Sequence, residues 1–384
     1  MVMGLYISTV ITSSLNKSSS DSPSFDPQPA PTTPSIPNPC SCAPTGLPST
    51  LSLSEAPSPT SHQTATSFDA SLDLPERLSG IKGLRKQLAA RARGHVLEVA
   101  VGTGRNLGYY DWSEVVSATQ DDEETREKRQ KERVMKLIDA STTGGGKDVT
   151  VKDGLARGVG SLEGEVLSFT GVDLSGDMVG VARDRVREAV PGLSKVMRRK
   201  RAEPMPRLDD PATNPDSESE IVVVDALGSR IRLVLADAMR GLPAPPQAIS
   251  SPPSANPSPT TPPPQKYDTI LQTFGLCSVP NPTTLLAHMA SHLQPDTGRI
   301  LLLEHGRGHY EWINKLLDDY APRHFQKYGC WWNRDIEAVV RDAAEAVPGL
   351  EVVSVERPLF LQAGTTLVVE LRVRSQKEEG KGKA

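Results

Sequence analysis

The stretch 95-HVLEVAVGTGRN-106 is a short apolar run that leads into Gly102-Thr-Gly104 and then into polar residues. An apolar run of this length is typical of a buried strand. Glycines at the turn after such a strand let a ligand approach the backbone, and free N–H groups at the start of the next helix bind its polar atoms. The stretch therefore predicts a strand, a ligand-binding loop and a helix.

Compact apolar segments alternate with helical patterns from this stretch to the C-terminus. A further helix is expected before it, at residues 78–92, where Leu78, Ile81, Leu84 and Leu88 have helical spacing. The seven predicted strands are residues 95–101, 167–172, 231–236, 269–273, 299–304, 350–355 and 366–373. This alternation predicts an α/β fold with a Rossmann-like, seven-stranded, doubly wound parallel sheet.

Composition divides the 384 residues into a tail and one domain. Only 37% of residues are hydrophobic and 4% aromatic, which is too dilute for a chain that is packed throughout. More than half of residues 11–65 are Ser, Thr or Pro, so we expect a disordered tail over residues 1–65 and one domain over residues 66–384. Low-complexity insertions are expected in the domain at about residues 113–164, 196–229 and 243–264.

Charge and cysteine content exclude several classes of protein. The 43 Lys+Arg against 47 Asp+Glu give a net charge of -4, which argues against a nucleic-acid partner held by charge. Cys40, Cys42, Cys277 and Cys330 are too few for a disulfide framework and lack the paired spacing of a structural zinc site. No metal site is predicted, and Cys277 is expected to pack rather than to act as a nucleophile.

The N-terminus carries a short apolar segment. Residues 1–15 are interrupted by Ser and Thr, and the segment is too short to span a bilayer. It also lacks the basic residues of a secretion signal and the Arg of an ordinary mitochondrial presequence. Two interpretations stay open, a weak membrane-associated segment and a frayed terminus.

Glu98 lies four residues before Gly102, and its negative charge indicates that the ligand group near it is cationic. A carboxylate at this place would repel a pyrophosphate, but it would pair with a cationic amino-acid ammonium. The complete Gly-x-Gly-x-x-Gly turn of a dinucleotide-binding strand is also absent. The loop therefore favours S-adenosylmethionine as cofactor over NAD(P), and it disfavours an NAD(P)-dependent oxidoreductase.

Three later strand ends agree with this cofactor. Asp173 ends the second predicted strand, where an acid binds ribose hydroxyls, and Met178 in the next helix is expected to pack on adenine. Asp237-Ala238 is placed for the adenine amino group, and Gln272 ends the central strand beside the same crevice. Either acid alone is more often a cap or a turn former, but the signals occur in the right order. The candidate cofactor-binding residues are Glu98, Gly102, Thr103, Gly104, Asn106, Asp173, Met178, Asp237, Ala238 and Gln272.

On these residues the chain resembles a class I S-adenosylmethionine-dependent methyltransferase of the ubiquinone/menaquinone methyltransferase superfamily. More closely, it resembles the fungal mitochondrial methyltransferase-like family related to a yeast inner-membrane suppressor of oxidative-assembly defects. The motifs that carry the resemblance are Gly80-Ile81…Leu84-Arg85-Lys86, Leu97-Glu98-Val99…Gly102-Thr103-Gly104-Arg105-Asn106…Tyr109-Tyr110-Asp111, Leu276-Cys277-Ser278, Leu303-Glu304-His305-Gly306-Arg307, Gly329-Cys330-Trp331-Trp332-Asn333-Arg334-Asp335 and Gly364-Thr365-Thr366. Ala100 occupies the first glycine position of the family's usual loop.

The resemblance implies a methyltransferase that acts on a small or lipophilic acceptor in mitochondria, with the inner membrane as one location. His305 is the candidate general base, needed only if the acceptor carries a proton at the reacting moment; the alternative is that it only orients its loop. Trp312, Trp331 and Trp332 are expected either to lid an apolar acceptor site or to form the core beneath a lid. The competing hypothesis is a non-catalytic assembly or scaffold protein with a methyltransferase fold.

Overall fold

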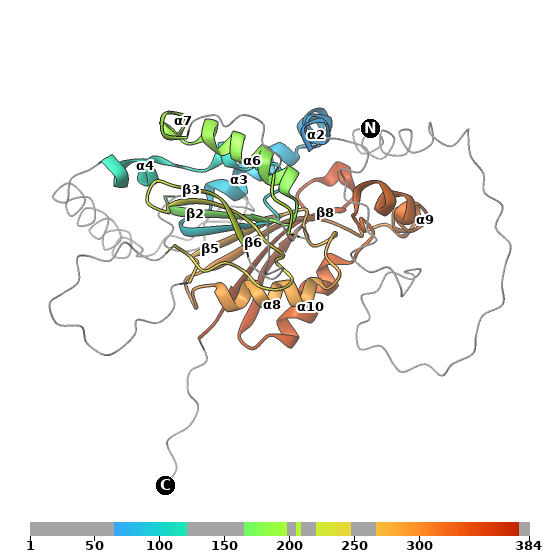
Figure 1. Ribbon diagram of the computed structural model, residues 1–384. Helices are drawn as coiled ribbons and strands as arrows, with labels where there is room; N and C mark the ends of the chain where they lie inside the picture. Colours follow the sequence, from blue (N-terminus) through green and yellow to red (C-terminus); the bar gives the residue numbers. More distant parts are fainter. Residues whose placement is uncertain (1–64, 121–164, 198–204, 209–219, 247–265, 376–384) are drawn as a thin grey trace, which may run out of the picture.

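A mixed β-sheet with helices on both faces forms the protein, as the computed structural model shows (Figure 1). The structure describes residues 65–120, 165–197, 205–208, 220–246 and 266–375. The predicted tail lies outside these residues except for its last position, and so do most of the first and third predicted insertions.

The sheet has eight strands in the order β3-β4-β2-β1-β5-β6-β8-β7. Their bounds are β1 Gly94–Val99, β2 Val166–Asp173, β3 Ile221–Ala226, β4 Ile231–Leu235, β5 Thr269–Thr273, β6 Arg299–His305, β7 Leu350–Glu356 and β8 Thr366–Val373. All seven predicted strands are present, within two residues at each end. The eighth, β3, lies inside the segment predicted to be a low-complexity insertion at 196–229, so that prediction was wrong for its apolar end.

Five strands are parallel, β1, β2, β4, β5 and β6, and the remaining three are antiparallel to their neighbours. The prediction of a parallel sheet is therefore correct for the centre and wrong for both edges. The physical reason is the length of the connections. Residues 227–230 between β3 and β4, and residues 357–365 between β7 and β8, are too few for the helical crossover that parallel neighbours need.

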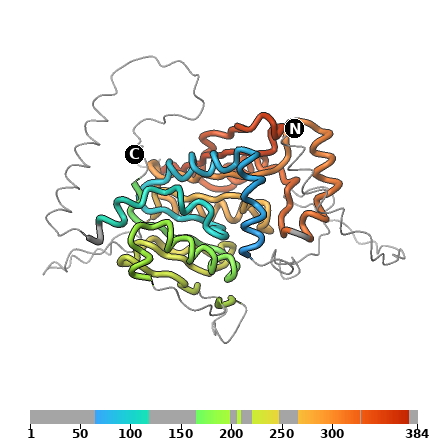
Figure 2. Tube along the Cα trace, turned by 90° about the horizontal axis from the view of Figure 1, so that it is seen from above, coloured from blue at the N-terminus to red at the C-terminus, as the bar shows by residue number. Residues whose placement is uncertain are grey.

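Helices cover the sheet in two layers (Figures 1 and 2). Helices α3, α4 and α6 pack on one face around Val96, Phe169 and Leu233, whereas α8 and α10 cover the other around Leu97, Ile270 and Leu302. The helix bounds are α2 Ala65–Ser79, α3 Ile81–Ala90, α4 Ser113–Gln120, α6 Gly176–Ala189, α7 Leu193–Val196, α8 Pro282–His292, α9 Glu311–Tyr328 and α10 Ile336–Ala346, with short 3-10 turns η2 Leu107–Tyr109 and η3 Phe360–Gln362.

The helix predicted at residues 78–92 is divided into two helices. Gly80 has a φ of 85°, a left-handed conformation that ends α2 and begins α3. Ile81, Leu84 and Leu88 are buried as the spacing predicts. Leu78 belongs to α2 and is 51% exposed, so its assignment to the same apolar face was wrong.

The order of the strands reverses at β1, which lies between β2 and β5. Val99 is aligned with Val172 of β2 and with Gln272 of β5, so the carboxyl ends of the three strands meet at one edge of the sheet. In open α/β sheets, ligands bind outside the carboxyl ends of the strands at such a switch point. The fold therefore places the predicted binding loop where a crevice is expected.

Within the described part of the chain, no helix is both long and apolar enough to cross a bilayer. The predicted N-terminal apolar segment lies outside these residues.

Candidate functional site

The loop after β1 has left-handed backbone at three positions. Ala100, Gly102 and Gly104 have φ values of 54°, 56° and 77°. Ala100 adopts a conformation that costs a non-glycine residue about 1–3 kcal/mol. The hydrogen bond from the Val101 N–H to the Val172 carbonyl, at 2.9 Å, holds the loop against β2 in this conformation. The loop is therefore fixed by its neighbour strand.

Asp173 joins the loop to the next helix. Its Oδ2 accepts the Gly102 N–H at 2.8 Å, and its Oδ1 accepts the Ser175 N–H at 2.9 Å. The Ser175 hydroxyl in turn caps α6 by accepting the Met178 N–H at 3.4 Å. Burial raises the pKa of Asp173 above its ordinary value, against the lowering effect of these N–H groups.

Glu98 is buried beneath the loop, where both of its carboxylate oxygens have partners. Oε1 accepts a hydrogen bond from Asn106 Nδ2 and Oε2 accepts one from the Tyr110 hydroxyl, each at 2.7 Å. Burial raises the pKa of Glu98 to about 7, although these bonds and the positive charge of Arg85 lower it. Glu98 and Asn106 are therefore brought together as predicted. Their observed contact is with each other, and the contact of Glu98 with an ammonium stays a prediction.

Thr103 is directed towards helix α2. Its hydroxyl donates to Asp69 Oδ1 at 2.6 Å, and the same carboxylate pairs with Arg105 at 2.8 Å and with Arg185 of α6 at 2.5 Å. Burial alone would raise the pKa of Asp69, but hydrogen bonds from Arg185, Thr103 and Arg105 lower it to about 2. Helix α2 is thus fastened over the loop by an ionised carboxylate.

A second carboxylate of α2 extends this contact. Glu76 pairs with Arg85 at 3.0 Å and with Arg105 at 3.2 Å, and both Glu76 and Arg85 are buried. Sequence reasoning missed the roles of Asp69 and Glu76. Neither lies in a recognisable motif, and their partners are far away in the chain, so no local signal was available.

The two remaining strand ends, of β4 and β5, present fewer contacts. Asp237 Oδ1 accepts the Met239 N–H at 2.9 Å, which is a turn-forming role, and the Ala238 carbonyl lies 3.0 Å from His288 Nδ1. Gln272 is fully buried, and neither amide atom of its side chain has a hydrogen-bond partner among the described residues. A buried amide without partners costs free energy, and a hydrogen bond from a ligand that reached it would offset this cost.

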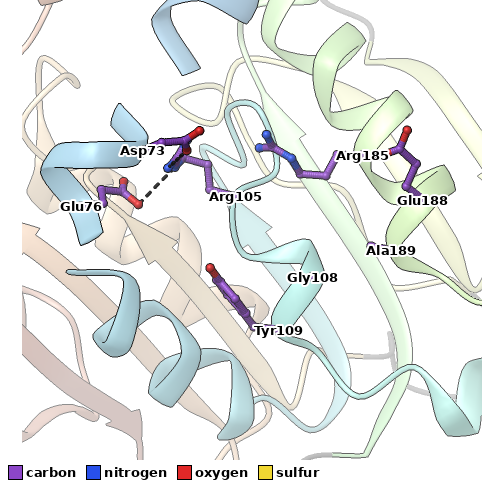
Figure 3. A pocket seen from close by; sticks show the side chains of 8 residues that line it. All are labelled: Asp73, Glu76, Arg105, Gly108, Tyr109, Arg185, Glu188 and Ala189. Atoms are coloured by element: carbon purple, nitrogen blue, oxygen red, sulfur yellow. Dashed lines mark hydrogen bonds and ion pairs between the residues drawn. The ribbon is translucent and has the colours of Figure 1, made fainter. Parts of the chain in front are cut away.

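A cavity of about 360 Å³ lies beside the loop, on the α2 and α6 side (Figure 3). It is lined by Asp73, Glu76, Arg105, Gly108, Tyr109, Arg185, Glu188 and Ala189. Of the predicted cofactor residues, none lines it. The cavity is strongly charged and none of its lining residues belongs to β2 or β5, so we do not identify it with the cofactor crevice.

His305, the candidate general base, ends β6 and lies against two cysteines. Its Nε2 is 3.0 Å from Cys330 Sγ, and Cys330 Sγ is 2.8 Å from Cys277 Sγ. The two cysteines are 53 residues apart, so their sequence spacing could not reveal the cluster. Cys277 is buried, in agreement with the expectation that it packs.

The tryptophans of the predicted lid separate into two environments. Trp331 and Trp332 are buried in a cluster with Ile313 and Leu317 of α9, which corresponds to the interpretation as core residues. Trp312 of α9 is 67% exposed. Helices α9 and α10 lie on either side of the Gly329 turn in the chain.

Both a family model and a curated protein that match this chain are described as methyltransferases. A family model described as a methyltransferase domain matches residues 73–344. The curated protein "Methyltransferase OMS1, mitochondrial" of Saccharomyces cerevisiae is 25% identical over 283 residues, which are 73% of this chain and 40% of the yeast protein. The chain therefore spans less than half the length of this relative.

Solved structures with a similar fold include two methyltransferases. An O-methyltransferase family protein from Burkholderia thailandensis gives a TM-score of 0.40 at 14% identity, over 82% of this chain and 62% of that one. Magnesium protoporphyrin IX methyltransferase from Synechocystis, solved with bound SAM, gives a TM-score of 0.36 at 13% identity, over 81% and 93% of the two chains.

Proposed function

Because the chain belongs to the methyltransferase domain family, we propose that it is an enzyme that binds S-adenosylmethionine at the carboxyl ends of β1, β2, β4 and β5. It would transfer the methyl group to a small or lipophilic acceptor. The observation that carries the proposal is the bond from the Gly102 N–H to Asp173 Oδ2, which holds a glycine loop and an acidic strand end together at the switch point of the sheet.

The residues at this edge fit the cofactor. A Cβ added to Gly102 would meet nothing closer than the Ala100 carbonyl oxygen at 4.0 Å, so the space above the loop is open to a ligand. The amide of Gln272 supplies a donor and an acceptor that lack partners among the described residues. Asp173 would bind ribose hydroxyls, and Asp237 with Ala238 would face the adenine.

The bound cofactor supplies an electrophilic methyl group on a sulfonium. The residues of this chain would then act mainly by positioning, since in-line displacement needs orientation and exclusion of water. Asp173 and Ser175 hold the loop and the start of α6 in place. Asp69 fastens α2 over the loop.

The mitochondrion is the proposed location, and the mitochondrial methyltransferase of yeast to which the chain is similar supports it. An inner-membrane location, and weak membrane association through the N-terminal segment, rest on the family resemblance alone. The competing proposal remains a methyltransferase-fold scaffold protein that does not bind the cofactor. The two proposals differ in one measurable property, which is affinity for S-adenosylmethionine.

Calorimetric titration of the full chain with S-adenosylhomocysteine tests the proposal. The informative variant is Gly102→Val, because its side chain would fill the open space above the loop. The matched control is Gly192→Val before α7: Gly192 also has positive φ, at 79°, and nothing lies within 4 Å of its added Cβ. We expect binding by the wild type and the control and none by Gly102→Val. A folded wild-type chain that binds no S-adenosylhomocysteine would favour the scaffold proposal.

A further inference from the structure

Three side chains that can coordinate a metal ion converge beside the carboxyl ends of β5 and β6. The sulfur atoms of Cys277 and Cys330 and a ring nitrogen of His305 all lie within 4.8 Å of one another. The two cysteines are buried and the imidazole is partly exposed. We propose that these three residues bind one thiophilic divalent cation, with Zn²⁺ as the candidate ion.

The backbone around each ligand is fixed by contacts of its own. Cys277 follows β5 in a turn whose Gly275 and Leu276 N–H groups donate to Glu304 Oε1 at 3.0 and 3.1 Å. His305 is the last residue of β6 and is paired with Thr366 of β8. Ligands that are held by a sheet and by a bonded turn need little reordering when a metal binds.

Cys330 reaches the other two ligands from the end of α9. Gly329 closes that helix in the left-handed conformation, with φ of 64°, and turns the chain back. The Trp331 N–H then donates to the Cys277 carbonyl at 3.0 Å, which ties the two cysteine-bearing turns together. The convergence therefore depends on main-chain geometry and not on side-chain rotamers alone.

The distance between the two sulfur atoms lies between that of a disulfide and that of two thiolates bound to one zinc ion. At 2.8 Å it is longer than a disulfide bond, which measures about 2.05 Å, and the two thiols are free. Two thiolates on a tetrahedral zinc ion lie about 3.8 Å apart, as follows from Zn–S bonds of about 2.3 Å. Each sulfur would have to move outward by roughly half an ångström to receive the ion.

Charge balance is compatible with a divalent cation at this place. The cluster is enclosed by Ile313, Leu317, Trp331 and Trp332, so an uncompensated charge would be costly there. Binding one M²⁺ releases the two thiol protons to solvent, and the two thiolates, one neutral imidazole and the ion together carry no net charge. A disulfide between the two cysteines would leave His305 Nε2 without a thiol proton to accept.

The ligand set resembles a zinc site with one open position. Structural zinc sites have four protein ligands, whereas two cysteines and one histidine leave a fourth position for water. The partly exposed His305 provides the direction from which this water would enter. In this assignment His305 Nε2 is a metal ligand, so the same nitrogen does not serve as a general base, and the site departs from the expectation that the chain holds no metal.

Cobalt substitution in the full chain tests the proposal. Reduced protein is stripped with a chelator and titrated with Co²⁺, and bound Co²⁺ is then displaced with Zn²⁺. We expect one equivalent of each ion and the thiolate-to-cobalt charge-transfer absorption of a cysteine-ligated site. Cys277→Ser and Cys330→Ser should abolish the band, and His305→Ala should weaken binding by tenfold or more. The matched control is the double variant Cys40→Ser/Cys42→Ser, which should keep the full signal.

Other outcomes would overturn the proposal. A wild-type chain with no charge-transfer band, a Cys277–Cys330 disulfide found by mass spectrometry without reductant, or a band retained in Cys330→Ser would each do so. If a cysteine variant fails to fold, X-ray absorption of the zinc-loaded wild type decides, because it must show two sulfur neighbours. These results are independent of S-adenosylhomocysteine binding, so failure of either proposal can be recognised separately.

Discussion

The Gly102 N–H donates to Asp173 Oδ2 at 2.8 Å, and this bond joins the loop after β1 to the end of β2 across 71 residues of sequence. The same carboxylate accepts the Ser175 N–H at the start of α6. One side chain therefore positions the loop and the following helix together.

Removal of the Asp173 carboxylate is expected to loosen the loop and abolish cofactor binding. Asp173→Ala leaves the Gly102 and Ser175 N–H groups without their acceptor, which should lower the free energy of unfolding by about 1–3 kcal/mol. S-Adenosylhomocysteine affinity should fall at least tenfold in calorimetry. Asp225→Ala on β3, where the carboxylate accepts an exposed Ser229 hydroxyl, is the control and should change neither quantity. Unchanged affinity in Asp173→Ala would contradict this role.

Glu98 is expected to make stability depend on pH. Its folded-state pKa of about 7 lies above the ordinary value of 4.5, so the protonated form is favoured by folding. The contribution is complete below pH 4.5 and is lost as the pH rises through 7, with an amplitude on the order of 3 kcal/mol. Denaturant unfolding at several pH values measures it.

The variant Glu98→Gln isolates this contribution. Because glutamine does not titrate, the fall in unfolding free energy between pH 4.5 and 7 should be much smaller in the variant than in the wild type. Glu345→Gln on the exposed side of α10 is the control and should retain the wild-type profile. Identical pH profiles for wild type and Glu98→Gln would show that Glu98 is not the group responsible.

Asp69 is expected to hold α2 on the domain. In Asp69→Ala the cations of Arg105 and Arg185 lose a largely buried partner, which should destabilise the α2 contact by about 3–5 kcal/mol. The measurement is hydrogen exchange of the amides in α2, which should accelerate selectively. Asp73→Ala removes a carboxylate that pairs with the same Arg105 but is 72% exposed, so its effect should stay below about 1 kcal/mol. Equal exchange in the two variants would contradict the assignment.

Protonation of Asp69 in acid is expected to weaken the contact between α2 and the domain. The pKa of Asp69 is lowered to about 2 from 3.8, so its contribution is present above pH 3.8 and disappears as the pH falls through 2. The protection of the α2 amides, taken relative to their intrinsic exchange rates at each pH, should therefore fall in this acidic window in the wild type. In Asp69→Ala this protection should already be low at neutral pH.

Gln272 offers a test that separates binding from stability. Gln272→Leu removes a buried amide that has no partner among the described residues, so the free energy of unfolding should stay the same or increase. If the amide contacts the cofactor, S-adenosylhomocysteine affinity should nevertheless fall about tenfold, since one bond is lost. A variant that is more stable and binds equally well would remove Gln272 from the site.

Local patterns were sufficient to predict the core of the fold. The apolar run before Gly102 and the similar runs before Asp173, Asp237 and Gln272 predicted β1, β2, β4 and β5, because strands buried on both faces are continuously apolar. Their shared edge then followed from parallel pairing. The antiparallel edges were not predicted, because an apolar run does not indicate the direction of its strand and the direction follows here from the short connections between β3 and β4 and between β7 and β8.

The amino-acid sequence by itself determined the strand–loop–helix order, the glycine loop and the acidic strand ends, because these depend on residues that are neighbours in the chain. Only the tertiary structure decided which side chains from distant parts of the chain come into contact. It placed Asp69 of α2 on the arginines beside the loop, and it brought Cys277, His305 and Cys330 to one point. Such contacts join residues tens of positions apart, and their formation depends on packing of the whole domain, which no local periodicity encodes.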